Sequence, residues 1–194
     1  MKIMAIIPAR GGSKRLKNKN IYPIWGKPML YWAIQACKNS SFKIDVCVSS
    51  DSDEILQVAR DLGVKTHRRG NATSNDKAYK QTAIREAAHY LEENYGKNDI
   101  YISLQANSPT VSSDQIDLGI KTLIEYNKDE IFSVDSNLLQ NAAFRIFKGD
   151  YVFQEDLSTN CGVVIAEAYD VHTLEDIKKI ESEIIKIWLI QQDT

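Results

Sequence analysis

The chain has 194 residues, of which 43% are hydrophobic and 26% are charged, and its formal net charge is −2. These values are typical of an ordinary globular protein, and the mildly negative charge argues against a nucleic-acid partner, which usually requires a broad basic surface. The sequence contains neither an apolar stretch of transmembrane length nor the apolar segment of a signal peptide, so we expect no membrane partner and no secretory segment.

Strand-like and helix-like patterns alternate along the chain. Apolar runs predict strands over residues 2–8, 43–49, 64–68, 99–104 and 130–135. Helical patterns cover residues 28–38, 51–62, 78–95 and 113–127, and Gly63 and Gly96 follow two of them as C-terminal caps. This alternation with short connections predicts an α/β fold with a mainly parallel sheet and helices on both faces.

The C-terminal part is less regular. We expect two short strands over residues 143–148 and 151–154 around a Gly149-Asp150 turn, then a further buried strand over residues 161–166. From residue 173 onward the pattern predicts a charged amphipathic helix with an unusually apolar end, which either packs on the core or also forms a subunit interface. We therefore expect residues 1–194 to form a single domain with a short irregular insert at about 136–160.

The first predicted strand ends in a Gly-Gly-Ser loop. Five cations lie in it, namely Arg10, Lys14, Arg15, Lys17 and Lys19. Glycines allow a tight turn and a close approach to a ligand, and backbone N–H groups among cations form an anion-binding concavity. Ligands of parallel sheets bind beyond the carboxyl ends of the strands, which is where this loop lies. We therefore favour a phosphate or nucleotide site over a solvated turn, although the loop matches neither G-x-x-x-x-G-K-[ST] nor G-x-G-x-x-G.

Six short motifs follow one another between residues 6 and 176. They occupy residues 6–20, 25–30, 48–55, 69–76, 103–109 and 170–176. In order, they are similar to the patterns I-P-A-R-x-x-S-K-G-x-x-x-K-N, G-K-P-L-I, V-S-T-D-D-x-E-I, R-P-x-x-L-A-x-D, L-L-Q-P-T-S-P and D-I-D-T-x-E-D. The set resembles the acylneuraminate cytidylyltransferase family of CMP-sugar synthetases, in a divergent and shortened form.

This resemblance implies a Rossmann-like three-layer nucleotidyltransferase fold and a CTP-dependent reaction. The anomeric hydroxyl of an acidic 2-keto sugar, a nonulosonic acid such as sialic acid or a relative, would attack the α-phosphorus of CTP. A CMP-sugar and pyrophosphate would be the products. The resemblance also implies CTP as co-substrate, Mg²⁺ or Mn²⁺ as cofactor, and a cytoplasmic homodimer. The three sparse cysteines, which lack C-x-x-C spacing, agree with a reducing cytoplasm.

The motif positions imply roles for individual residues. Arg10, Lys14 and Lys19 would be catalytic by neutralising the triphosphate and the departing pyrophosphate. The nucleotide would contact Ala9, Arg10, Gly11, Gly12, Ser13, Lys14, Lys19, Asn20, Arg69 and Asp76. The sugar would face Gln105, Asn107 and Ser108. Backbone N–H groups from Ala9 to Ser13 would cradle the triphosphate.

The metal motif departs from the family pattern. Asp170 stands at its first carboxylate, but His172 replaces the second. Hard Mg²⁺ prefers oxygen ligands and imidazole suits softer ions, so His172 is either a metal ligand or a structural residue. Asp170 with triphosphate oxygens and waters could hold Mg²⁺ without it.

Other departures leave alternatives open. Arg15 replaces a family glycine, and the short segment at about 136–160 leaves Arg145 and Lys148 as its cations for a sugar carboxylate. An active cytidylyltransferase with altered sugar or metal use is the leading interpretation. The alternative is a catalytically impaired nucleotide- or sugar-binding relative that acts as a regulatory or partner subunit. A third interpretation, transfer to a sugar phosphate, is disfavoured because the strand end at residues 104–109 lacks the aspartate such enzymes place there.

Overall fold

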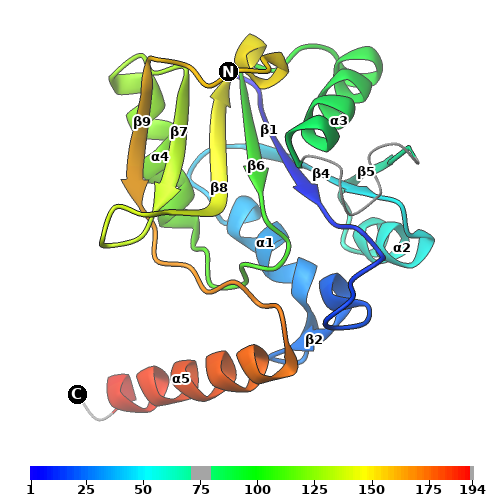
Figure 1. Cartoon of the computed structure of the whole chain (residues 1–194), viewed down its shortest axis with the longest axis vertical. Coiled ribbons are helices and arrows are strands. Elements are labelled where there is room, and N and C mark those ends of the chain that lie inside the picture. The colour runs from blue at the N-terminus through cyan, green and yellow to red at the C-terminus, as the bar shows by residue number, and fades with distance from the viewer. Residues whose placement is uncertain (71–79, 193–194) are drawn as a thin grey trace.

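The structure is a computed structural model that describes residues 1–70 and 80–192, with side chains up to residue 183. Its centre is a seven-stranded sheet in the order β5-β4-β1-β6-β8-β7-β9 (Figure 1). The strands are β1 (Ile3–Pro8), β4 (Ile44–Ser50), β5 (Lys65–Arg68), β6 (Ile100–Leu104), β7 (Glu130–Val134), β8 (Gln140–Lys148) and β9 (Cys161–Ile165). Within this sheet only β8 runs antiparallel to its neighbours. The prediction of an α/β fold with a mainly parallel sheet is confirmed.

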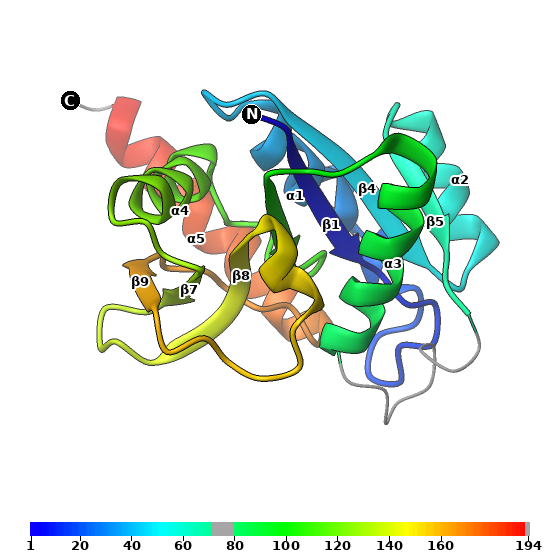
Figure 2. The ribbon, with the colours of Figure 1, turned by 90° about the horizontal axis from the view of Figure 1, so that it is seen from above.

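Helices cover both faces of the sheet, as Figure 2 shows, with α1, α2 and α4 on one side and α3 and η3 on the other. The helices are α1 (Met29–Lys38), α2 (Asp53–Asp61), α3 (Lys80–Tyr95), α4 (Ser113–Glu125) and α5 (Leu174–Gln192), and the 3-10 helices are η1 (Lys19–Ile21) and η3 (Gly149–Phe153). A small hairpin pairs β2 (Pro23–Ile24) with β3 (Lys27–Pro28). None of the helices in the described ranges combines the length and the apolar character needed to span a bilayer.

The strand β1 lies in the middle of the fold and is buried on both faces. Ile3, Ala5 and Ile7 pack in the cluster under α1, α2 and α4, whereas Met4 and Ile6 pack in the cluster under α3. A strand covered on both sides needs apolar side chains at successive positions, which explains its continuous apolar run. The loop that leaves β1 is therefore fixed to the most buried part of the protein.

The C-terminal helix α5 packs against the protein with its first half. Ile177 and Ile180 are buried in a third cluster with Leu16, Ile24 and Met29. The backbone N–H of Trp25, between β2 and β3, donates to Glu181 Oε1 over 3.0 Å. The hydrogen bond joins α5 to the hairpin, and packing against Leu16 joins it to the basic loop. The rest of the helix extends away from the sheet (Figure 1).

Two details of the predicted C-terminal part are wrong. Residues 151–154 do not form a strand, because residues 149–153 form η3, which inserts Val152 into the core against α3. The strand β9 forms as expected but lies at the edge of the sheet, where Val163 and Ile165 are 52% and 53% exposed. An apolar run shows that a strand forms, but it does not show how many neighbours cover it.

Candidate active site

Three parallel strands bring the predicted motifs to one edge of the sheet. Pro8 of β1 pairs with Ser49 of β4, and Ile6 pairs with Ser103 of β6, so the carboxyl ends of these strands lie together. The basic loop leaves β1, Asp51 follows β4, and Gln105 follows β6. This edge is the position at which α/β sheets bind ligands.

The neighbouring β4–α2 corner holds the basic loop in place. The N–H of Gly11 donates to Asp51 Oδ1 over 2.8 Å. A Cβ atom on Gly11 would lie 2.9 Å from the Cβ of Ser52, which caps α2, whereas a Cβ atom on Gly12 would meet nothing within 4 Å. Any side chain at position 11 would therefore clash with Ser52, so packing requires glycine there. The second half of the loop is held by Asn20, whose Nδ2 donates to Arg10 O over 2.9 Å.

Several backbone N–H groups that were expected to cradle phosphate have partners within the protein. The N–H of Ala9 donates to Ser49 O, and that of Ser13 donates to Gly11 O, both over 2.9 Å. With Gly11 bonded to Asp51, three of the five N–H groups in residues 9–13 have partners within the protein. The structure therefore favours the loop side chains over these amides as anion contacts.

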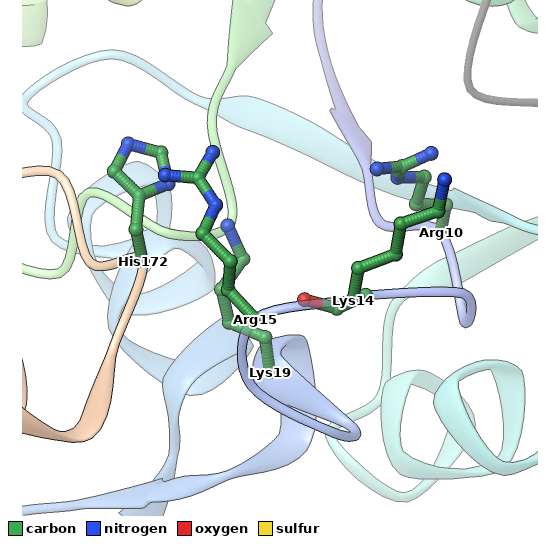
Figure 3. A pocket seen from close by; sticks show the side chains of 6 residues that line it. Arg10, Lys14, Arg15, Lys19 and His172 are labelled. Atoms are coloured by element: carbon green, nitrogen blue, oxygen red, sulfur yellow. The ribbon is translucent and has the colours of Figure 1, made fainter.

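The loop side chains line a cavity of about 220 Å³ (Figure 3). Its walls are Arg10, Ser13, Lys14, Arg15, Lys19 and His172. Arg10 and Lys14 lie on one side, and Arg15, Lys19 and His172 lie on the other. A cavity lined by four cations matches the negative charge of a triphosphate. Arg15 is one of the five loop cations, but no role was predicted for it, because it replaces a glycine of the family pattern.

Crowding among these cations is visible in the electrostatics of Lys19. Burial lowers the pKa of Lys19, and the nearby charges of Arg15 and Arg10 lower it further, while Asp170 opposes them. Burial and the two arginines disfavour the ammonium form, whereas Asp170 and Asp176 favour it. A bound polyanion would reverse this balance, so the cavity is electrostatically prepared for one.

Arg69 lies behind the loop, at the end of β5. It is buried, and its guanidinium donates to Ser49 O over 3.1 Å. Its Nε atom is buried without a hydrogen-bond partner among the described residues. Burial lowers the pKa of Arg69, while Asp51 and Glu86 oppose the shift. Arg69 thus connects the end of β5 to β4, and Asp51 connects the basic loop to the end of β4. Asp76 lies outside the described residues.

The residues expected to face a sugar take different positions. Gln105 is half-buried, and its Nε2 donates to Ala142 O over 2.7 Å. Asn107 and Ser108 are buried and hold the segment that leads to α5. Asn107 Nδ2 donates to Val171 O over 3.3 Å, and Ser108 Oγ donates to Asp170 Oδ1. In this arrangement Asn107 and Ser108 position Asp170, and Gln105 lies beside Ala142 of β8.

Asp170 offers a limited donor set for a metal ion. One of its carboxylate oxygens accepts the Ser108 hydrogen bond, and the described residues include no group of three or more His, Cys, Asp or Glu side chains that could hold a metal ion. His172 lines the cavity, but the nearby Asp176 accepts from the N–H groups of His172 and Thr173 over 2.8 Å each. These N–H groups hold the pKa of Asp176 below its usual value. The residues fit Mg²⁺ that is bound by one carboxylate and otherwise by phosphate oxygens and waters.

The two cations expected to bind a sugar carboxylate are engaged elsewhere. The guanidinium of Arg145 pairs with Glu130, which is buried. Lys148 Nζ donates to Asn127 Oδ1 over 3.0 Å, and Lys148 pairs with Ile100 at the start of β6, away from the carboxyl ends of the parallel strands. The expectation for Lys148 is wrong because β8 runs antiparallel and carries it to the opposite edge of the sheet. The charge of Arg145 is compensated within the protein.

Comparison with known proteins agrees with this arrangement. The chain is 34% identical to N-acylneuraminate cytidylyltransferase A of Danio rerio over 132 residues, and 33% identical to pseudaminic acid cytidylyltransferase of Campylobacter jejuni over 134 residues. These alignments cover 68% and 69% of this chain but 30% and 58% of the relatives, so the chain spans less than two thirds of their length. A post-translational flagellin modification protein B of Campylobacter coli is 29% identical, with 92% of this chain and 93% of that protein covered.

Solved structures support the fold. A CMP:2-keto-3-deoxy-manno-octonic acid synthetase in complex with CTP superimposes with a TM-score of 0.77 at 17% identity, over 96% of this chain and 99% of that one. A cytidylyltransferase from Leptospira borgpetersenii gives a TM-score of 0.73 at 18% identity, over 94% of this chain and 86% of that one. Finally, the family model described as Cytidylyltransferase matches residues 4–183. This protein therefore belongs to the cytidylyltransferase family.

Proposed function

We propose that the protein is a CTP-dependent cytidylyltransferase that activates an acidic 2-keto sugar of the nonulosonic acid class. The observation that carries the proposal is the cation-lined cavity at the carboxyl end of β1, in a chain of the cytidylyltransferase family. The names of the relatives, which include N-acylneuraminate and pseudaminic acid cytidylyltransferases, support the sugar class. Residues 1–194 would form one nucleotidyltransferase-like domain.

In the proposed reaction the anomeric oxygen of the sugar forms a bond to the α-phosphorus of CTP. The bond from that phosphorus to the bridging oxygen breaks, pyrophosphate leaves with the electron pair, and the hydroxyl proton passes to solvent. Arg10, Lys14 and Lys19 would neutralise the triphosphate and the charge that develops on pyrophosphate. Asp51 and Asn20 would keep these side chains in place by holding the loop.

Asp170 would contribute the protein carboxylate for Mg²⁺ or Mn²⁺. Such an ion, when bound, supplies positive charge to the phosphate oxygens. Ser108 orients Asp170 through its hydrogen bond, which leaves the second carboxylate oxygen for the ion. We also propose a homodimer in the cytoplasm, and the three free cysteines, Cys37, Cys47 and Cys161, agree with that reducing compartment.

The experiment that tests the function is pyrophosphate release. The protein is incubated with CTP, Mg²⁺ or Mn²⁺, and a panel that includes N-acetylneuraminic, pseudaminic and 2-keto-3-deoxy-manno-octonic acids. We expect release with at least one acid, and none when the acid is omitted or when UTP replaces CTP. CTP binding without release for every acid would contradict the proposal and favour a binding subunit that has lost catalysis.

A further inference from the structure

A second cavity, of about 210 Å³, opens between the start of α3 and the outer half of the sheet. Its lining combines polar groups with an aromatic wall, including Lys80, Gln81, Ser103, Gln140 and Phe144. Hydrogen-bonding side chains beside an apolar wall suit a polyhydroxylated ring that carries apolar C–H surface. The cavity is therefore a candidate sugar subsite.

Charge connects this cavity to the nucleotide cavity. Asp170 lies within electrostatic reach of Lys19 in the first cavity and of Lys80 in the second. The proposed metal carboxylate is therefore near both cavities. A sugar in the second cavity would face the α-phosphate of a nucleotide in the first, as the proposed transfer requires.

Three elements converge on one carbonyl group in this second cavity. The carbonyl oxygen of Ala142 on β8 accepts a hydrogen bond from Gln105 Nε2 over 2.7 Å, and another from Lys80 Nζ over 3.4 Å. Ala142 has φ +56°, in the left-handed region that alanine seldom adopts. Such a conformation persists only where its surroundings hold it, and it is common at binding sites. The two hydrogen bonds fix Gln105 and Lys80 beside each other.

Lys80 and the neighbouring Arg145 differ in the groups that compensate their positive charges. Arg145 is paired with buried Glu130, and its guanidinium stacks 4.6 Å from the ring centres of Phe132 and Phe147. Lys80 donates to a carbonyl oxygen, which carries only a partial charge. Burial lowers the pKa of Lys80 to about 8, and the charge of Asp170 opposes that shift. Lys80 also stands at the start of α3, the positive end of that helix dipole. An anionic group in the cavity would therefore be drawn to Lys80 rather than to Arg145.

We propose that Lys80 binds the carboxylate of the acidic sugar and thereby selects acidic sugars over neutral ones. This inference rests on the proposed function and assigns a specificity-determining residue within it. Gln105 supports Lys80 through their shared contact with Ala142 O. The cations of the basic loop serve the nucleotide, so the two anionic groups of the reactants bind to separate sets of cations.

The test measures equilibrium binding of the sugar acid to CTP-loaded protein by calorimetry, alongside binding of the corresponding neutral amide. Loss of a charge-assisted contact corresponds to a weakening of roughly tenfold or more, so Lys80→Ala should bind the acid at least tenfold more weakly. Its affinity for the amide and for CTP should change less than twofold, and Lys80→Arg should retain most of the acid affinity. Lys121→Ala, which removes an exposed lysine on α4, is the matched control and should behave as wild type.

The outcomes separate this inference from the proposed function. Weaker CTP binding in Lys80→Ala would place a nucleotide phosphate at Lys80 and overturn the inference. An unchanged ratio of acid to amide affinity would also overturn it, as would a wild-type protein that binds none of the acids. Absence of pyrophosphate release from wild type, with acid binding that depends on Lys80, would instead overturn only the proposed catalysis.

Discussion

The substitution Gly11→Ala tests whether packing on α2 positions the nucleotide loop. The added Cβ would lie 2.9 Å from Ser52 Cβ, which is about 0.5 Å closer than ordinary contact. Ser52 caps α2 by accepting from Ile55 N, so it cannot move without cost. The loop must then shift and strain the Gly11 N–H bond to Asp51. Overpacking of this kind costs about 1–3 kcal/mol.

Gly12→Ala is the matched comparison, because a Cβ atom there enters open space. Urea denaturation should show that Gly11→Ala lowers the free energy of unfolding by about 1–3 kcal/mol, whereas Gly12→Ala changes it by less than about 0.5 kcal/mol. In a pyrophosphate assay, a loop displaced by up to 1 Å should lower kcat in Gly11→Ala by up to about 100-fold. Equal stability of the two variants would refute the argument that the β4–α2 corner fixes the loop.

Three further predictions concern charged groups. Lys14→Ala should weaken CTP binding by roughly 1.5–3 kcal/mol, measured by calorimetry, whereas Lys17→Ala, in the same loop but outside the cavity lining, should have little effect. His172→Asp should raise affinity for Mg²⁺ in titrations of activity, since a second carboxylate would join Asp170, and an unchanged response would remove residue 172 from the metal site. Burial lowers the pKa of His67 from 6.5, with Arg69 adding to the shift and Glu86 opposing it. Because the unfolded chain then binds the proton more readily, the stability contributed by neutral His67 is complete above pH 6.5 and is lost as the pH falls below that value. In His67→Gln, the free energy of unfolding measured with urea should therefore depend less on pH below 6.5.

Much of the fold could be predicted, because its signals are local. The apolar run of β1, the strand ends and the glycines after α2 and α3 act through near neighbours, and they agree with the structure within a few residues. The direction of β8 could not be read in this way, since apolar periodicity is the same in parallel and antiparallel strands. Because β8 is antiparallel, Lys148 lies at the opposite edge of the sheet from the carboxyl ends of the parallel strands.

The same difference between local and long-range signals applies to the predictions for the site. The cations of the basic loop lie close together in sequence and line one cavity. Gly11 and its partner Asp51, in contrast, are 40 residues apart, and Lys80 and its partner Ala142 are 62 residues apart. Motif spacing does not show such contacts, so it predicted a role for neither Asp51 nor Lys80. Ser108 belongs to a motif, yet its contact with Asp170 became visible only once the two segments were placed side by side.

The central claim is that the cavity between the basic loop and His172 binds the triphosphate of CTP, and a crystal structure of the protein with CTP and Mg²⁺ tests it most directly. We predict phosphate density in contact with Lys14 and Lys19, with the α-phosphate toward Asp170. Triphosphate density at any other place on the protein would contradict this assignment, as would an empty cavity in crystals grown with saturating CTP.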